Sequence, residues 1–547
     1  MSYLKNVVRG LTSATTPQDQ PIAGSNQVPN SAGGYVWQVD DWMRLQRFLI
    51  LGSEGGSYYA SERKLSAENA NKVLDCIAQD GLRVVQAVVE ISESGRAPKN
   101  DPALFVLALC ASLGDVSTRK AALQALPRVA RTGTHLMHFA AFVDGMRGWG
   151  RGLRRAIGDW YNQKPARDVA YQALKYQARD GWSQRDLLRL AHPQPASESH
   201  RTIFHWMAQG WEGVGEQPHP DQALQQIWAW EKAKRENDAN QVVNLIRNYR
   251  LPREAVPTQF LSEVKVWEAL LEQMPMTALI RNLANLTRIG VLTSNGNWTR
   301  RVVEQITDEA RLRKARVHPI AVLSALRTYA QGRGERGQNT WKPLPQIVDA
   351  LDAAFYRSFG NVVPASKRFL LGLDVSGSME CGVIAGVPGL TPRVASAAMA
   401  LITAATETAY QTVAFTSTSG AWSTNTALNE LPISPRQRLD DVLKTVSNLP
   451  FGGTDCALPM IWALKNKVET DVFVIYTDNE TWAGKIHPAQ ALKEYREKTG
   501  IDAKLIVVGM VSNGFSIADP NDAGMLDVVG FDTATPQLMS DFARGAL

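Results

Sequence analysis

Cysteine is scarce in this chain of 547 residues, which contains only Cys76, Cys110, Cys381 and Cys456. The four positions are widely scattered, and no two of them form a C-x-x-C pair. This spacing excludes the disulfide framework of a small secreted domain. We therefore expect four reduced thiols.

Long apolar runs are missing as well. The sequence has no stretch of about 18 consecutive apolar residues, the length needed to cross a membrane. Its first residues, MSYLKNVVRG, lack the apolar core of a signal peptide. The sequence thus predicts neither a membrane span nor an export signal, and the cytoplasm is the expected location.

Two common catalytic motifs are also lacking. The chain contains no G-x-x-x-x-G-K-[ST] and no H-E-x-x-H, which removes the usual signals of P-loop nucleotide chemistry and of zinc proteases. We predict no catalytic residues and no enzymatic activity.

The composition that is present is that of a globular protein with more than one domain. Hydrophobic residues make up 44% and charged residues 20%, and 547 residues exceed what one core usually organises. The net charge of +6 is unevenly spread, because residues 366–547 hold 14 Lys and Arg against 19 Asp and Glu. Such asymmetry indicates that the N-terminal part faces a polyanion, although ordinary solvated charge would look the same.

The periodicity of apolar residues divides the chain into three parts. Residues 1–27, rich in Ser, Thr, Pro, Gln and Gly, predict a mobile tail. Residues 28–365 show apolar positions at spacings of three and four, which predict paired helices without a crisp repeat, as in an irregular HEAT-like solenoid. From residue 366 to 547, strands alternate with helices and predict a doubly wound, mostly parallel α/β sheet.

Small oxygen-bearing side chains gather where strands of this predicted sheet end. LLGLDVSGSM places Asp374, Ser376 and Ser378 after the first strand, FGGTD contributes Thr454, and VFVIYTD ends at Asp478. Ligand sites in such sheets lie at the carboxyl ends of the strands. Carboxylate and hydroxyl oxygens are suited to a hard divalent cation, Mg²⁺ first and Ca²⁺ or Mn²⁺ next. The alternative is an Asp-Ser turn that only caps the following helix.

The densest positive stretch of the chain runs from Arg147 to Arg189. If ARDVAYQALKYQARDGW is one helix, an aromatic ring and three cations share one of its faces, where they could contact phosphates and stack on a base. A solvated helix face with local ion pairs is the alternative. The candidate RNA-binding residues are Arg151, Arg154, Arg155, Lys164, Arg167, Tyr171, Lys175 and Arg179, with Arg281 and Arg288 in RNLANLTR.

Two resemblances refine this interpretation. The residues at 374, 376, 378, 454 and 478 resemble the metal-ion-dependent adhesion site of von Willebrand factor A domains. GRGLRRAIGDWY, ALKYQARDGWSQRDLLRLAHP, MPMTALIRNLANLTRIG and VHPIAVLSALRTYAQG, followed by LDVSGSM, resemble the Ro ribonucleoprotein autoantigen family, built on the TROVE module. The match spans about residues 28–547 and points to a bacterial member of that family.

The family resemblance implies a ring of helical repeats closed by the A domain. Family members bind small noncoding Y RNA on the outer basic surface and take single-stranded 3′ ends of misfolded RNA into the hole. Bacterial members work with 3′-to-5′ exoribonucleases such as polynucleotide phosphorylase in RNA quality control. A monomer is expected in the absence of RNA.

Two positions depart from the family patterns. Many A domains have Gly after the last metal-site Asp, whereas Asn479 and Glu480 follow here, so Glu480 could either help to hold the ion or compete with an external carboxylate. Ro proteins commonly have His after GWS, whereas this chain has Gln184. Gln can hydrogen-bond to RNA but cannot become cationic.

Two other functions fit the same residues. The chain could be a metal-dependent protein-adhesion scaffold in which RNA plays no part. It could also be a metal-dependent nuclease, but two-metal nucleases need several carboxylates, and only Asp374 and Asp478 are offered here.

Overall fold

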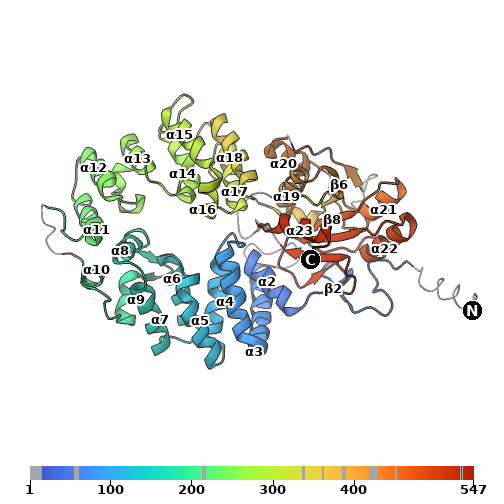
Figure 1. Cartoon of the computed structure of the whole chain (residues 1–547), viewed down its shortest axis with the longest axis horizontal. Helices are drawn as coiled ribbons and strands as arrows, with labels where there is room; N and C mark the ends of the chain where they lie inside the picture. The colour runs from blue at the N-terminus through green and yellow to red at the C-terminus, as the bar shows by residue number, and fades with distance from the viewer. Residues whose placement is uncertain are drawn as a thin grey trace, which may run out of the picture. The chain divides into compact units, whose positions relative to one another are not determined.

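The computed structural model describes residues 15–53, 61–211, 217–334, 339–359, 362–384, 390–417, 428–435, 437–449, 452–529, 531–532 and 534–546. The chain divides into two compact units. One contains Val73–Ser358, and the other joins Phe359–Leu547 to the N-terminal segment up to Lys72. Figure 1 labels the helices and strands of both units.

The second unit is the predicted α/β domain, built on a six-stranded sheet in the order β11-β9-β8-β5-β6-β7. All pairs are parallel except the edge pair of β6 and β7. Its central strands are continuous apolar runs because both sheet faces are covered. The strands are β5 (Arg368–Asp374), β6 (Ala409–Phe415), β7 (Leu428–Glu430), β8 (Val472–Thr477), β9 (Lys504–Gly509) and β11 (Met525–Val529).

Helices cover the two faces of this sheet. Phe473 and Ile475 of β8 share a buried cluster with residues of α21 and α22. The alternate residue Tyr476 lies within hydrogen-bonding distance of Thr403 on α19, hydroxyl to hydroxyl, at 3.3 Å. Since successive side chains of a strand point to opposite faces, α19 covers the other face. The helices are α19 (Pro392–Thr406), α20 (Leu439–Ser447), α21 (Leu458–Lys465), α22 (Pro488–Thr499) and α23 (Thr535–Arg544).

The N-terminal segment is part of the α/β unit. Strands β1 (Gln27–Pro29) and β2 (Tyr35–Gln38) form a small antiparallel sheet with β10 (Phe515–Ser516). The Gln18 side chain is buried and donates to Asp455 Oδ1 and to the Ile486 carbonyl, each at 2.8 Å. The predicted mobile tail is therefore wrong for residues 15–27, because their polar groups are satisfied by the α/β unit, while residues 1–14 lie outside the described residues.

Helix α2 (Asp41–Leu51) joins the same unit through a buried cation. The guanidinium of Arg47, with no exposed surface, donates to Asp527 Oδ2 at 2.5 Å and to the Phe515 carbonyl at 2.8 Å. A buried charge needs such a partner, since an isolated one would be strongly destabilising.

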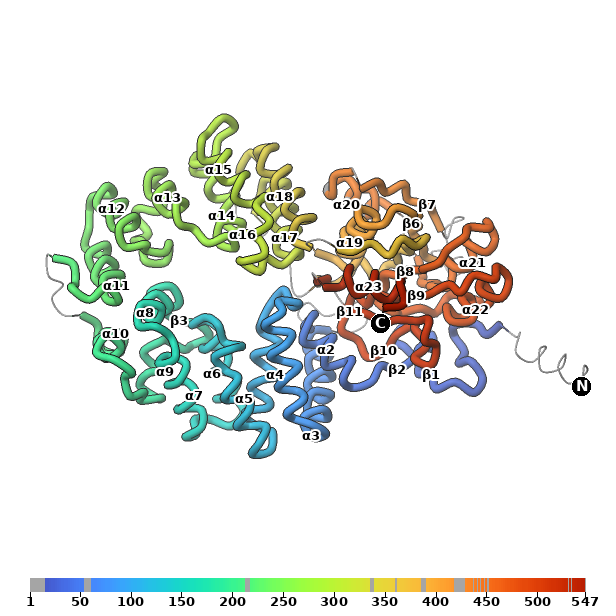
Figure 2. The backbone as a smooth tube through the Cα atoms, viewed as in Figure 1, coloured from blue at the N-terminus to red at the C-terminus, as the bar shows by residue number. Residues whose placement is uncertain are grey.

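The other unit is the predicted helical array. Helices packed against each other are close neighbours along the chain, as Figure 2 shows for the whole series. The bounds are α3 (Glu62–Ser94, kinked at Asp80 and begun in the α/β unit), α4 (Asp101–Leu113), α5 (Val116–Val129), α6 (Gly133–Met146), α7 (Arg151–Asn162), α8 (Ala166–Lys175), α9 (Gln184–Ala191), α10 (Glu198–Gln209), α11 (Gln222–Ala233), α12 (Ala239–Tyr249), α13 (Val264–Leu271), α14 (Met276–Arg288), α15 (Asn297–Ile306), α16 (Glu309–Lys314), α17 (Pro319–Ala330) and α18 (Pro345–Arg357).

The end of this array meets its beginning. His318 precedes α17, and its Nδ1 accepts from the amide of Ile320 at 3.1 Å. This leaves Nε2–H to donate to the carbonyl of Arg96, which follows α3, at 3.0 Å. A buried imidazole thus joins two segments separated by more than 200 positions in the sequence.

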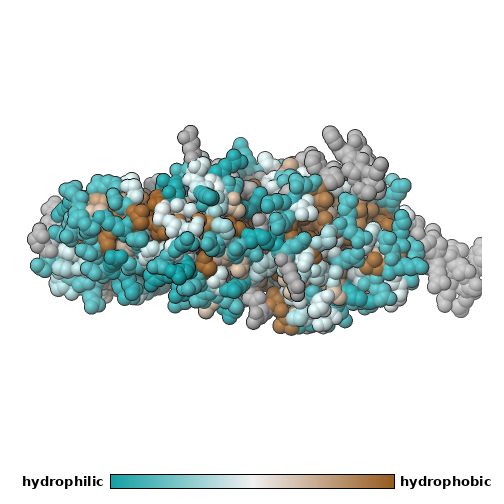
Figure 3. Space-filling model, turned by 90° about the horizontal axis from the view of Figure 1, so that it is seen from above, coloured by the Kyte–Doolittle hydropathy of each residue, from teal (hydrophilic) through white to brown (hydrophobic). Residues whose placement is uncertain are grey.

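Figure 3 shows one face of the molecule coloured by hydropathy. On the face drawn in Figure 3, hydrophilic residues predominate and apolar residues lie between them in small groups. Among the described residues, no helix combines the length and the apolar character needed to cross a bilayer.

Candidate metal centre and nucleic-acid interface

The first oxygen cluster is built by the end of β5 and the short helix η3 (Gly377–Glu380). Asp374 is fully buried, and its two oxygens accept from the amide of Ser376 at 2.9 Å and from the hydroxyl of Thr477 at 2.7 Å. The hydroxyl oxygens of Ser376 and Ser378 lie 3.1 Å apart. The D-x-S-x-S spacing therefore curls three oxygen-bearing side chains around one point.

The other two loops join this cluster. The amide of Gly377 donates to the carbonyl of Gly452 at 3.3 Å, which brings the Thr454 turn to the β5 loop. Asp478, after β8, accepts from the hydroxyl of Ser378. Thr454 and Asp478 are both buried. The structure thus gathers all five predicted residues at the carboxyl edge of the sheet.

The two carboxylates of this cluster lie in an unfavourable electrostatic environment. Burial raises the pKa of Asp374, although hydrogen bonds from Ser376 and Thr477 oppose the shift. Burial, and then the charge of Asp374, raise the pKa of Asp478. In the part of the chain that the structure describes, no three His, Cys, Asp or Glu side chains gather as a metal-ligating group. Two repelling carboxylates with hydroxyls between them fit a single hard cation, which would reverse both shifts.

One carboxylate oxygen of Glu480 is already engaged by the main chain. Its Oε2 accepts from the amides of Ser31 and Ala32 at 2.9 and 3.1 Å. The N-terminal segment therefore occupies this carboxylate oxygen, a contact that the local sequence around Asp478 could not reveal.

Thr477 and Arg393 are two positioning residues that the sequence interpretation missed. Thr477 lies on β8, the direct neighbour of β5, so only the sheet order brings its hydroxyl to Asp374. The buried guanidinium of Arg393, on α19, donates to the carbonyls of Val375 and Ser376. Both residues hold the D-x-S-x-S loop in place.

A second polar surface lies on α7 of the helical unit. Leu153, Ile157 and Trp160 bury one side of this helix. Arg151, Arg154 and Arg155 follow a spacing of three and four and are all exposed. Residues with that spacing lie on one face of a helix, so the three predicted cations form a single exposed row.

Helix α8 presents a mixture of charge and aromatic surface. Arg167 is exposed, whereas Tyr171 and Lys175 are half-buried, with Lys175 Nζ 3.3 Å from the Tyr171 hydroxyl. Lys164, just before α8, lies 3.8 Å from the centre of the Trp160 ring. Burial lowers the pKa of Lys164 to about 8, so this side chain loses part of its charge in mildly alkaline solution.

Comparison with known proteins decides the family. The TROVE domain model matches residues 28–328, and the Ro60 vWA domain model matches residues 368–543. The chain belongs to the Ro60 family. A relative named RNA-binding protein RO60 from Deinococcus radiodurans is 45% identical over 99% of this chain and 100% of its own length. One of the same name from Caenorhabditis elegans is 38% identical over 97% of this chain and 92% of its own length.

A solved member of the Ro60 family has the same fold. The crystal structure of the Deinococcus radiodurans RO (RSR) protein matches with a TM-score of 0.70 at 45% sequence identity, over 93% of this chain and 100% of that one. The names of both relatives describe RNA binding and neither names an enzyme, which agrees with the prediction that this Ro60 family member is not an enzyme.

Arg179 does not lie on α8, so the predicted single helix is wrong. The helix ends at Lys175, and Arg179 instead lies on strand β3 (Ala178–Arg179) of a hairpin with β4 (Trp182–Ser183). Asp180 and Gly181 have φ of 52° and 78°. An Asp-Gly pair with positive φ at both positions makes the tight turn of a hairpin. The chain therefore leaves the helix before Arg179, although the spacing of Arg167, Tyr171 and Lys175 would place Arg179 on the same helix face.

The hairpin is anchored on α6 and the loop that follows it. His138 of α6 contacts the carboxylate of Asp180, and the rings of Trp149 and Trp182 lie 5.3 Å apart. Figure 2 shows β3 beside α6. The exposed Arg179 is thus presented by a supported turn, with Asp180 Oδ1 3.7 Å from its Nε.

Gln184, predicted to contact RNA, lies in the interior of the helical unit rather than on its exposed surface. Its side chain is buried, accepts from the Tyr161 hydroxyl at 2.6 Å and donates to the Tyr176 carbonyl at 2.7 Å. The residue sits at the start of α9, where the chain turns inward after the Ser183 capping box. It therefore ties α7 to the end of α8.

Replacing Gln184 with alanine is expected to destabilise the protein by about 1–3 kcal/mol, since the buried Tyr161 hydroxyl loses its acceptor. Urea unfolding measures the loss. The matched double variant Gln184→Leu with Tyr161→Phe removes both polar partners and should recover part of the stability. If Gln184→Ala kept its stability but bound RNA more weakly, Gln184 would be an RNA-contacting residue after all.

The two candidates on α14 are exposed. Arg281 adjoins Asn282 in the sequence, and Arg288 donates to Asn285 Oδ1 at 2.7 Å near the end of the helix. They lie about two helical turns apart, so they form separate points of charge rather than one patch.

Proposed function

We propose that the protein binds RNA through its helical unit. The observation that carries this proposal is the row Arg151, Arg154 and Arg155 on α7, all exposed. Among the described residues, none of the three arginines forms an ion pair. Guanidinium groups without acidic partners can neutralise phosphates, and each phosphate neutralised releases counterions and favours binding.

The form of this surface favours structured RNA. Arg179 on a supported hairpin and the cations of α7 contact a sugar-phosphate backbone without reading bases, which suits the shape of an RNA helix. We propose small noncoding Y RNA as this ligand. Single-stranded 3′ ends of misfolded or ribosomal RNA are the second ligand class, for which aromatic groups such as Tyr171 offer stacking.

The biological role proposed is RNA quality control. A 3′-to-5′ exoribonuclease such as polynucleotide phosphorylase is proposed as the partner that degrades the bound RNA. The protein would then act as the part that selects and holds RNA.

The α/β unit is proposed to hold one divalent cation, with Mg²⁺ preferred. Asp374, Ser376, Ser378, Thr454 and Asp478 would supply its oxygen ligands, and the paired buried carboxylates support this assignment. The bound cation would supply Lewis acidity that attracts an acidic group of a partner. Thr477 and Arg393 keep the ligand loop in its shape through the hydrogen bonds described above.

Sequencing of RNA that copurifies with the tagged protein tests the RNA proposal. Small structured RNAs and fragments with single-stranded 3′ ends are expected to be enriched over a tag-only control. A variant with alanine at Arg151, Arg154 and Arg155 should recover less of both. Recovery of no RNA above the control would overturn the proposed function.

A further inference from the structure

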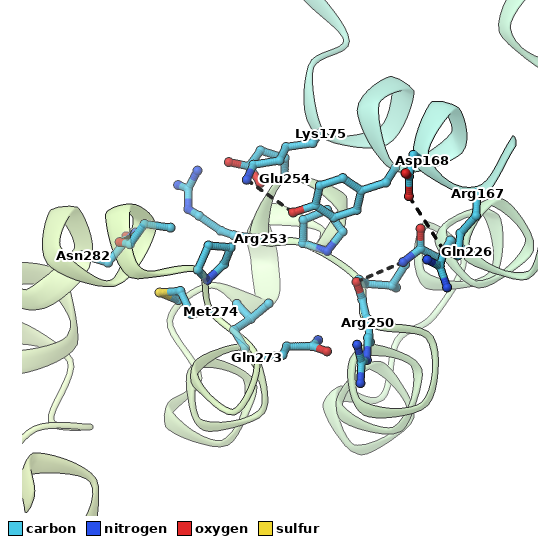
Figure 4. Close-up of a pocket in the computed structure, with 16 residues that line it drawn as sticks. Arg167, Asp168, Lys175, Gln226, Arg250, Arg253, Glu254, Gln273, Met274 and Asn282 are labelled. Atoms are coloured by element: carbon cyan, nitrogen blue, oxygen red, sulfur yellow. Dashed lines mark hydrogen bonds and ion pairs between the residues drawn. The ribbon is translucent and has the colours of Figure 1, made fainter. Parts of the chain in front are cut away.

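A pocket of about 340 Å³ opens in the helical unit between α8, the loop that follows α12, and α14 (Figure 4). It lies within the size range of small-molecule sites, which begins at about 300 Å³. Its walls carry Tyr171 from α8, Arg250 and Arg253 from the loop, and Asn282 from α14. Segments more than a hundred positions apart in the sequence thus share one concave surface.

The cations around this pocket differ in their partners. Arg167 Nε lies 3.8 Å from Asp168, and Lys175 contacts the Tyr171 hydroxyl and interacts with the charge of Glu254. Arg250 and Arg253 are exposed, and within the described part of the chain neither forms an ion pair. These two guanidinium groups are therefore exposed and, among the described residues, without an acidic partner, which leaves them open to an anion.

The amide side chains of the pocket are held in one orientation. Gln226, Gln273 and Asn282 each donate from the side-chain NH₂ group to a main-chain carbonyl, at 3.1, 3.0 and 2.8 Å respectively. Each bond uses one N–H of the amide and so leaves the side-chain oxygen and the second N–H for other partners. The Gln226 Oε1 atom is buried without a hydrogen-bond partner.

We propose that this pocket takes one unpaired nucleotide of the bound RNA, an inference that rests on the proposed RNA-binding function. The base lies against the ring of Tyr171, and Arg250 and Arg253, whose guanidinium groups lie on different sides of the pocket in Figure 4, each contact one of two neighbouring phosphates. The side-chain oxygens of Gln273 and Asn282 are acceptors for a base whose edge offers N–H donors. The pocket thereby holds a single-stranded segment in place by stacking and charge together.

The test uses a single-stranded RNA decamer with one 2-aminopurine, a base that carries an exocyclic amino group and whose fluorescence falls on stacking. Wild type and Tyr171→Phe are expected to quench the probe equally, and Tyr171→Leu to bind about tenfold more weakly without quenching. The double variant Arg250→Gln with Arg253→Gln should also bind about tenfold more weakly. It should lower the slope of log affinity against log salt by about 1.4.

The control variant is Arg311→Gln with Arg313→Gln on α16, where both arginines are exposed and paired with Asp308 and Glu309. Its affinity and salt slope are expected to match the wild type, and circular dichroism verifies that every variant is folded. If the Tyr171→Leu and the Arg250/Arg253 variants bound the decamer as tightly as the wild type does, the proposed nucleotide pocket would be wrong, while the RNA-binding function would stand. Failure of the wild type to bind the decamer would instead overturn both.

A free nucleoside monophosphate, titrated in place of the decamer, distinguishes a pocket for RNA from one for a free metabolite. Binding at least about 100-fold weaker than that of the decamer is expected, because the monophosphate lacks the neighbouring phosphate contacts. Equal or tighter binding would overturn the assignment to RNA.

Discussion

Alanine at both Lys175 and Arg179 is expected to weaken the binding of a small structured RNA by about 100-fold. Each lost charge-assisted contact costs roughly 1.5 kcal/mol, and each 1.4 kcal/mol corresponds to about a factor of ten in affinity. The slope of log affinity against log salt should also fall by about 2, since two phosphates are no longer neutralised. Fluorescence anisotropy with labelled RNA, at several salt concentrations, measures both quantities.

The two residues act from different elements, which the single variants separate. Arg179→Ala removes an exposed charge from the hairpin and leaves the contact between Lys175 and Tyr171 intact. Lys175→Ala removes a half-buried charge from the end of α8. The double variant of Arg311 and Arg313 serves as the control here too. If the Lys175/Arg179 variant bound RNA as tightly as the wild type does, neither residue would belong to the RNA-binding site.

Asparagine at Asp478 is expected to stabilise the metal-free protein and to abolish its response to divalent cations. The substitution removes a buried carboxylate whose pKa is raised by burial and then by the charge of Asp374, and it leaves Asp374 without that like-charged neighbour. For the wild type, Mn²⁺ at about 100 times its Kd should add about 2.7 kcal/mol to the free energy of unfolding. Thermal unfolding with Mn²⁺ and with a chelator measures both effects.

Asp471→Asn is the matched control for the metal site. Asp471 lies at the opposite edge of the same sheet and pairs with Arg368, with Oδ1 2.6 Å from a guanidinium nitrogen. This variant should be less stable than the wild type in every buffer but should keep the full gain on addition of Mn²⁺. A wild type that is no more stable with Mn²⁺ than with chelator would show that the D-x-S-x-S loop is only a helix cap.

The sequence predicts the α/β unit well because its signals are local. Each buried strand is a short apolar run, and Asp374, Thr454 and Asp478 follow strands or turns that the parallel sheet must bring to one edge. Local sequence did not predict the roles of Thr477 and Glu480. Their roles depend on the order of strands and on the N-terminal segment, which reaches Glu480 from about 450 positions away.

The helical unit was harder to predict because apolar period alone does not fix where a helix ends. The period continued through Arg179, but the Asp180–Gly181 turn ended the helix first. Gln184 follows a polar turn and was expected on the surface, yet its partners Tyr161 and Tyr176 come from other elements. The sequence did not single out Arg250 and Arg253, because a pocket formed by helices far apart in the chain leaves no local sequence pattern.

The most direct test of RNA binding by the helical unit is a salt titration of the purified protein, freed of nucleic acid, with a small structured RNA. Binding is expected at low ionic strength and should weaken steeply between about 50 and 200 mM salt, as contacts to several phosphates require. Absence of binding at low salt, or an affinity that ignores salt and follows only the divalent cation, would contradict the account.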